Sequence, residues 1–240
     1  MPDAYGYKKM INASKIYKMR IVFRLTLEQT SNTKILNAVR NTVLASGLPW
    51  EPTHFNKNWP RLAYGPGVGE GQKALREYAD IYLVSSVPVT QVQQRLQAAK
   101  PDFLELLSVT RVPYALPSVQ NLAAAAKYRI EGDFASFTLE QPVEDYFKSA
   151  QVNVIYRAEN GLTLTKDIKQ WILSSRTVSA QEIELVLACK AGKFLSPQVA
   201  LAAYLGIEIP AAEDSFTVAG FTITREGLYW QDSQQALHLI

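Results

Sequence analysis

The chain has 240 residues, of which 48% are hydrophobic and 20% are charged. This composition excludes wholesale disorder and predicts a packed core, in one large domain or two small ones. The net charge of +3 does not by itself indicate a nucleic-acid-binding protein, but residues 1–40 carry eight basic and two acidic side chains. We interpret residues 1–17 as a basic N-terminal arm, either a solvated terminus or an electrostatic contact for RNA or an acidic protein.

The inventory of metal-binding side chains is small. The single cysteine, Cys189, excludes an intramolecular disulfide and any iron–sulfur cluster held by several cysteines of this chain. It lies in the apolar run 183–189, which predicts a buried structural thiol. His54 and His238 are the two histidines, so we expect no metal and no cofactor. Apolar runs fall short of the roughly 20 residues of a membrane helix, and we expect a cytoplasmic protein without a membrane partner.

The N-terminal half opens with a strand and a helix. Residues 19–25 are rich in β-formers, and Ser31 begins a helix that Gly47 ends. A loop over residues 50–73 follows and contains a short strand at 61–64. The next predicted elements are a strand at 77–84, a helix at 89–99 and a strand at 103–112. The order β-α-β-β-α-β is typical of ferredoxin-like units.

Two prolines, Pro113 and Pro117, then interrupt the pattern. An alanine-rich stretch at 118–126 predicts a short connecting helix, and we place the domain boundary there, between units at 18–117 and 118–240. In the second half we expect strands at 128–131, 152–156, 168–174, 183–189 and 221–225, and helices at 142–150 and 196–205. The predicted fold class is α+β, with two ferredoxin-like units packed together, the second one divergent.

Five segments stand in a characteristic order and spacing: Lys18-Met19-Arg20-Ile21-Val22-Phe23, Phe55-Asn56, Pro60-Arg61-Leu62, Glu77-Tyr78-Ala79-Asp80-Ile81 and Leu195-Ser196-Pro197-Gln198. With them the chain resembles a family of radical-SAM-linked proteins that occur alone or fused C-terminally to a radical SAM protein. The resemblance spans residues 18–230. It implies a radical SAM protein as a partner and, through the genes that accompany the family, possible partners among RNA and ribosomal components.

The resemblance also implies a role. With one cysteine the chain cannot hold the three-cysteine cluster of a radical SAM enzyme. We therefore expect a non-catalytic accessory or substrate-recognition protein of such an enzyme, in RNA or ribosome-related metabolism. The family's central loop usually reads Gln-Gly-Phe-Asn-Pro, whereas here His54 precedes Phe55 and Lys57 replaces the proline. A family site in this loop would be altered here.

Basic and aromatic side chains suggest a second function, a free-standing RNA-binding module. Arg20 and Arg24 lie an even number of residues apart on one strand and share a face. Ferredoxin-like sheets bind single-stranded RNA by stacking bases on aromatic rings while cations hold phosphates. The ordinary alternative is core aromatics and solvated cations. The candidate binding residues are Arg20, Arg24, His54, Phe55, Asn56, Arg61, Tyr64, Lys73 and Arg76.

A third hypothesis is an enzyme that uses the central loop. His54 is an accessible candidate for a general base. The glycine-rich segment 65–73 lacks the Gly-Lys-Ser/Thr ending of a P-loop and does not open the first βα turn. It predicts a flexible turn between strands more than a phosphate-binding loop. We assign no catalytic residue.

Overall fold

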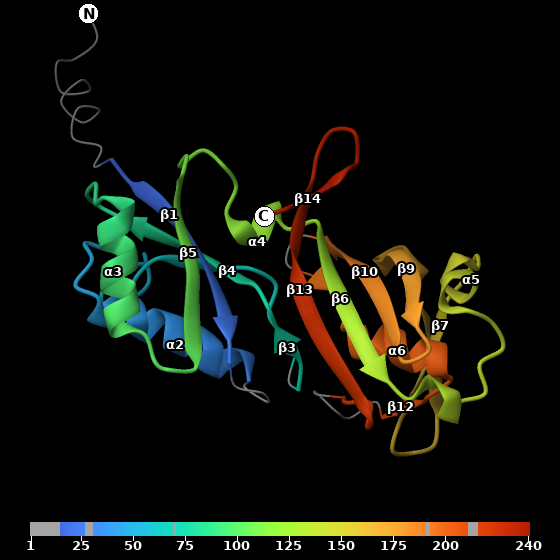
Figure 1. Ribbon diagram of the computed structural model, residues 1–240. Coiled ribbons are helices and arrows are strands. Elements are labelled where there is room, and N and C mark those ends of the chain that lie inside the picture. Colours follow the sequence, from blue (N-terminus) through green and yellow to red (C-terminus); the bar gives the residue numbers. More distant parts are fainter. Residues whose placement is uncertain (1–14, 27–30, 70, 191–192, 211–215) are drawn as a thin grey trace, which may run out of the picture.

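The computed structural model describes residues 15–26, 31–69, 71–190, 193–210 and 216–240. The chain forms two α+β units side by side, each with its own hydrophobic core (Figure 1). The predicted α+β class is confirmed. Most of the N-terminal arm predicted at 1–17 lies outside the described residues, and Tyr17 already belongs to the first strand.

The N-terminal unit is a four-stranded antiparallel sheet with two helices on one face. Its elements are β1 (Tyr17–Leu25), α2 (Asn32–Ala45), β2 (Leu62–Tyr64), β4 (Glu77–Leu83), α3 (Val89–Ala99) and β5 (Leu104–Val112). The strand order is β2-β4-β1-β5, and each neighbouring pair is antiparallel. The order of elements along the chain is the predicted β-α-β-β-α-β.

Alternation along β1 divides its side chains between the two faces of this sheet. Met19, Ile21 and Phe23 face the helices and are at most 3% exposed. Helix α2 buries Ile35 and Val39, at helical spacing, against the same core. The helix begins at the predicted place because the Ser31 hydroxyl accepts a hydrogen bond from the Lys34 amide.

The C-terminal unit is built on a seven-stranded sheet and a smaller three-stranded sheet. Along the larger sheet the order is β11-β10-β6-β13-β14, with β9 beside β10 and β3 beside β13, and the smaller sheet has the order β12-β7-β8. The elements are β3 (Lys73–Ala74), α4 (Val119–Leu122), β6 (Ala125–Gly132), η1 (Phe134–Ser136), α5 (Val143–Lys148), β7 (Asn153–Arg157), β8 (Thr163–Asp167), η2 (Lys169–Trp171), β9 (Ile172–Ser179), β10 (Glu182–Lys190), β11 (Lys193–Phe194), α6 (Pro197–Leu205), β12 (Ile209–Pro210), β13 (Phe221–Gln231) and β14 (Leu237–Leu239).

This second arrangement does not confirm the prediction of two ferredoxin-like units. β6 is central and pairs antiparallel with β10 and β13. β9 pairs with β10 as a hairpin, and the later β11 lies on the other part of that strand. One member of the sheet comes from the N-terminal half, because β3 pairs in parallel with β13.

The predicted connecting helix at 118–126 is wrong in extent. Helix α4 is limited to Val119–Leu122, and β6 begins at Ala125. Ala125 and Ala126 are fully or almost fully buried between β10 and β13. Alanine's helix propensity is a weak preference, and backbone pairing on both sides of β6 overrides it.

Candidate binding site

A buried ion pair between Arg225 on β13 and Glu77 on β4 joins the two units. Arg225 Nε donates to Glu77 Oε1 at 2.8 Å, and the two side chains are 0% and 7% exposed. Burial raises the pKa of the Glu77 carboxyl, and the adjacent guanidinium opposes that rise. Arg225 Nη1 also donates to the carbonyl of Gly67 at 3.0 Å. The pair therefore ties the glycine-rich segment to the C-terminal unit.

The glycine-rich segment 65–73 is packed between the units over its described residues. Gln72 is buried, and its Nε2 donates to Gln198 Oε1 at 2.6 Å. A Cβ atom added at Gly65 would meet the Leu228 side chain at 2.6 Å. At Gly65, the absence of a side chain allows close packing between the two units.

The cations predicted on the sheet face are paired with carboxylates. Arg20 Nε lies 2.8 Å from Asp80 Oδ1, and the side chains are 8% and 0% exposed. Arg24 lies at the surface and its Nε donates to Glu105 Oε2 at 2.9 Å. Asp80 also accepts a hydrogen bond from the Val119 amide at 2.8 Å. The Arg20 charge is therefore neutralised by Asp80 in the interior of the protein.

The sheet face opposite the helices is partly covered by the C-terminal unit. Val22 on β1 and Tyr78 on β4 are cross-strand partners on this face, and both pack against the C-terminal core. Burial raises the pKa of the Tyr78 phenol, and the Arg76 guanidinium beside it opposes the rise. Tyr78 is 1% exposed and therefore offers no surface on which a base could stack.

Residues 51–61 form a hairpin-like projection at the edge of the N-terminal sheet, which we call the finger. At its base the Glu51 amide donates to the Tyr82 carbonyl at 2.7 Å and the Arg61 amide to the Glu51 carbonyl at 2.6 Å. Further out, Pro52 and Pro60 form an antiparallel bridge. The finger thus continues the backbone pairing of the sheet beyond β2.

The tip of the finger is an ordered turn. Thr53 Oγ1 donates to the Asn56 carbonyl at 2.7 Å and accepts from the Asn56 amide at 3.0 Å. Asn56 Oδ1 accepts from the Asn58 amide at 2.9 Å. The Trp59 amide donates to the Asn56 carbonyl at 3.1 Å. Side-chain and backbone hydrogen bonds therefore fix the turn from both ends.

This turn presents two aromatic rings to solvent. Phe55 is fully exposed, at 103% of its reference area, and Trp59 is 46% exposed. The Arg40 guanidinium, from α2, lies 4.2 Å from the centre of the Trp59 ring. His54 and Lys57 are exposed beside Phe55. The finger thus gathers His54, Phe55 and Asn56 of the predicted site.

The other predicted residues have different surroundings. Arg61 lies at the base of the finger, paired with Glu51 at 2.9 Å, with its guanidinium 4.1 Å from the centre of the Tyr82 ring. Tyr64 packs against the N-terminal core and donates to the Leu36 carbonyl at 3.0 Å, and burial raises its pKa to about 12. Lys73 lies on β3 in the C-terminal sheet, and Arg76 follows it. The structure does not bring these last three side chains to the finger tip.

Sequence reasoning missed Arg40 and Lys18. Arg40 is half-buried on α2, and no local pattern relates it to Trp59. Lys18 lies two positions before Arg20 on β1 and therefore on the same face of the strand. The two-residue period of the strand could have indicated this placement. The Lys18 side chain is buried and its Nζ donates to the carbonyls of Leu116 and, at 3.4 Å, Tyr114.

Cys189 is buried, as predicted, and burial raises the pKa of its thiol to about 11. Among the described residues no three His, Cys, Asp or Glu side chains are grouped so as to hold a metal ion. In the same residues no helix is long and apolar enough to span a membrane.

Comparison with known proteins gives a family but no activity. No curated protein matches the chain. The family model described as an uncharacterized protein conserved in bacteria, DUF2344, matches residues 18–197. The match begins in β1 and ends at the start of α6, so it includes the finger and both sides of the Asp80–Arg20 pair. Since it covers three quarters of the chain, the protein belongs to the DUF2344 family.

Proposed function

We propose that this protein is a non-catalytic recognition subunit of a radical SAM enzyme and that it uses the finger to hold a partner or substrate in RNA or ribosome-related metabolism. The observation that carries the recognition role is Phe55, a fully exposed aromatic ring on a turn fixed by hydrogen bonds. The radical SAM partner is supported by the resemblance of the segments over residues 18–230.

An exposed phenylalanine on a rigid turn is suited to binding. Burying an aromatic side chain removes roughly 150–250 Å² from water, which corresponds to several kcal/mol at about 25 cal/mol per Å². The Thr53–Asn56 hydrogen bonds already order the turn, so little further conformational entropy is lost when a partner encloses Phe55. Large single contributions of this kind are typical of the central residues of interfaces.

The division of labour follows from the cysteine count. A radical SAM reaction needs a cluster ligated by several cysteines, and this chain has one, whose thiol is buried. In the proposed complex the cluster and the chemistry belong to the partner. The finger would position the substrate or grip the enzyme.

The second candidate is direct binding of single-stranded RNA by the finger. It is favoured by Arg40 over the Trp59 ring and by the exposed Lys57, two positions after Phe55 in the same turn. Cations beside exposed rings are the elements with which proteins hold phosphates and stack bases without strict sequence preference. Such binding would weaken steeply with salt, whereas burial of Phe55 in a protein pocket would not.

The enzyme hypothesis has less support. His54 is exposed, and no hydrogen bond or ion pair to its ring is found among the described residues. A general base needs an orienting partner or a substrate within hydrogen-bonding reach. The glycine-rich segment, the other element of this hypothesis, already makes hydrogen bonds within the protein, from Gln72 to Gln198 and from Arg225 to the Gly67 carbonyl.

The proposal is tested by affinity purification of the tagged chain from its own cells, with and without RNase, in wild-type and Phe55→Ser forms. Capture of a radical SAM protein that survives RNase and is lost in Phe55→Ser supports the recognition role. Leu164→Ser is the matched control, because Leu164 is 67% exposed on β8, far from the finger in the chain. Capture of RNA alone, lost on RNase treatment, would favour the second candidate, and capture unaffected by Phe55→Ser would refute the role of the finger.

A further inference from the structure

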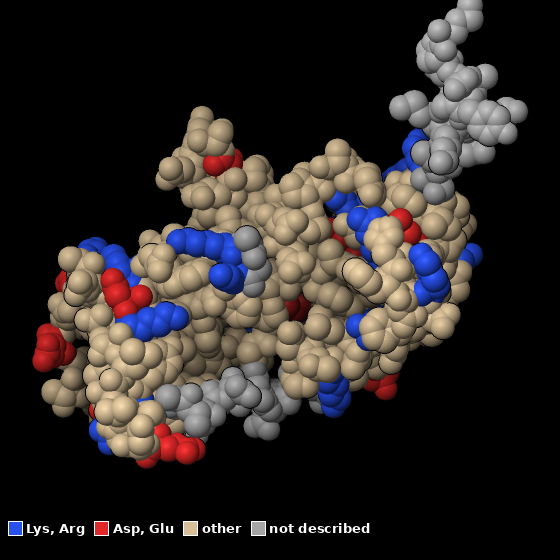
Figure 2. Space-filling model, turned by 180° about the vertical axis from the view of Figure 1, so that it is seen from behind, with Lys and Arg blue, Asp and Glu red and all other residues tan. Residues whose placement is uncertain are grey.

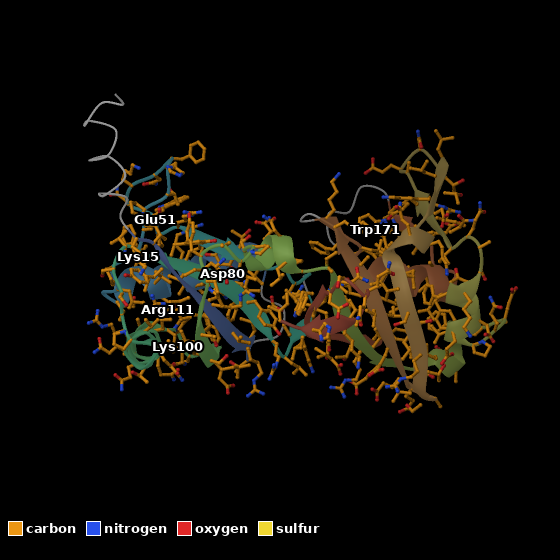
Figure 3. The ribbon with its side chains drawn as sticks, turned by 90° about the horizontal axis from the view of Figure 1, so that it is seen from above. Lys15, Glu51, Asp80, Lys100, Arg111 and Trp171 are labelled. Carbon is orange, nitrogen blue, oxygen red and sulfur yellow. The ribbon has the colours of Figure 1, made fainter. Side chains whose placement is uncertain are left out.

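A second candidate site lies at the outer end of the N-terminal sheet, where β1 starts and β5 ends. A groove of about 380 Å³ is lined there by Lys15, Tyr17, Lys18, Arg111, Pro113 and Tyr114, among others. Lys15 and Arg111 lie at the same end of this unit in Figure 3, and Figure 2 shows Lys and Arg side chains near the base of the grey N-terminal trace. Among the described residues, the lining contains three cations and no carboxylate.

Two of these cations, Lys15 and Arg111, contact the same aromatic ring. Arg111 Cζ lies 4.6 Å and Lys15 Nζ 5.8 Å from the centre of the Tyr17 ring. Arg111 also contacts a neutral group, since its Nη1 donates to Ser86 Oγ at 3.5 Å. The ring attracts both cations through its quadrupole but adds no compensating negative charge.

Lys18 adds a buried charge at the Tyr114 end of the groove, on the face of β1 opposite Tyr17. Its side chain is 1% exposed, and its ammonium donates to the carbonyls of Leu116 and Tyr114. Carbonyl oxygens satisfy hydrogen bonds but do not neutralise a cation. Burial lowers the pKa of Lys18, as do Arg20 and Arg61, and Asp80 opposes this.

Two described carboxylates around the groove, Asp80 and Glu51, already have cationic partners. Asp80 is 2.8 Å from Arg20, and Glu51 is 2.9 Å from Arg61. Arg61 Nη1 in turn lies 3.4 Å from the Tyr114 hydroxyl at the edge of the groove. The groove and its surroundings thus carry more positive than negative charge, which makes a bound anion electrostatically favourable.

We propose that this groove binds a phosphate group, contacted by Arg111 and Lys15 and stabilised by the buried Lys18 charge at the Tyr114 end. A guanidinium matches phosphate oxygens bidentately, and a lysine adds a mobile point charge. Tyr114, 53% exposed, offers an aromatic surface beside the phosphate for a base or another planar group. The ligand is either a small phosphorylated molecule such as a nucleotide or a phosphate of an RNA backbone.

The site is tested by NMR titration of the full chain with inorganic phosphate, AMP and a six-nucleotide oligouridylate. Shifts are expected in the amides of residues 15–18 and 111–114. Arg111→Gln and Lys15→Gln are each expected to weaken phosphate binding about tenfold, the scale of a lost charged hydrogen bond. The matched control is Arg95→Gln, since Arg95 is an exposed arginine of the same unit that donates to the Gly47 carbonyl at 3.0 Å.

The outcomes separate the two ligand sources and the two proposals. Tighter binding of AMP than of oligouridylate identifies a small phosphorylated ligand, and the reverse order with strong salt dependence identifies RNA. Phe55→Ser leaves all three titrations unchanged if the groove is independent of the finger. The proposal is overturned if none of the three probes shifts residues 15–18 and 111–114, or if Arg95→Gln weakens binding as much as Arg111→Gln.

Discussion

Arg225 and Glu77 pair side by side in the interior, although one belongs to the last long strand of the C-terminal sheet and the other to the N-terminal sheet. Both Arg225 Nε and Nη2 donate to the Glu77 carboxylate. A charge in such a position is stable only while its partner is present. The pair thus stabilises the contact between the two units, and each of its charges depends on the other.

Loss of either partner should therefore destabilise the whole chain. Glu77→Gln and Arg225→Met are each expected to lower the free energy of unfolding by about 3–5 kcal/mol, because each leaves a buried charge or polar group without its partner. The double variant Glu77→Leu with Arg225→Met should lose much less unfolding free energy than the sum of the losses in the two single variants, because it leaves neither charge buried without a partner. Urea denaturation measures all three. A loss below about 1 kcal/mol in either single variant would contradict a buried, mutually dependent pair.

The order of the finger should matter more for binding than for stability. Thr53→Val keeps the shape of the side chain but removes both Thr53 hydrogen bonds to Asn56. We expect faster hydrogen exchange at the Asn56 amide, a change in unfolding free energy of at most about 1 kcal/mol, and roughly fivefold weaker capture of the partner. Exchange by NMR and the affinity purification measure the two effects. Faster exchange with unchanged capture would show that preorganisation of the turn is irrelevant.

Cys189 should behave as an inert thiol in the native state. Its pKa of about 11 leaves little thiolate at pH 8, and the side chain is buried. A thiol reagent such as dithionitrobenzoate is expected to react only when urea unfolds the chain. Rapid stoichiometric reaction of the native protein at pH 8 would contradict the burial of this residue.

Asp232 and His238 give a pH-dependent contact in the β13–β14 hairpin. The His238 ring nitrogen Nε2 lies 2.7 Å from Asp232 Oδ2, and this contact holds the pKa of Asp232 below its ordinary value of 3.8, helped by the amides of Ala236 and Gln234. A lowered folded-state pKa contributes stability that is fully present above the ordinary value and is lost as pH falls through the lowered one.

Replacing the histidine should shift that window. In His238→Ala the pKa of Asp232 is expected to rise towards 3.8 without reaching it, because the two backbone amides still donate to the carboxylate. A carboxyl carbon NMR titration between pH 2 and about 6 follows the change. An unchanged pKa would mean that the amides alone determine the ionisation of Asp232.

Local patterns predicted much of the secondary structure. Helix α3 begins and ends at the predicted residues, because Val92 and Leu96 recur at helical spacing between Pro88 and Pro101. The α6 helix also follows its signals, with Pro197 in the first turn and Gly206 in the left-handed conformation at its end. These elements are fixed by residues within one or two turns of each other.

Partner choice could not be read from local patterns. Arg20 was correctly placed on a strand, but its partner Asp80 is 60 positions away and became visible only through the pairing of β1 with β4. The same holds for Arg40 and Trp59, which meet through the packing of α2 near the finger. The alternation of residues along a strand predicts which side chains share a face. Which charges are neutralised depends on the packing of segments that lie far apart in the chain.

The crossing of β3 into the C-terminal sheet has a consequence for synthesis of the protein. Lys73 and Ala74 pair with Thr224 and Arg225, so a ribosome must add about 150 residues between the two partners. Until β13 emerges, Glu77 lacks its guanidinium and the glycine-rich segment lacks its packing surface. The nascent N-terminal half can form its own four-stranded sheet, but β3 and the glycine-rich segment stay unpaired until β13 is made, which gives a chaperone time to bind them.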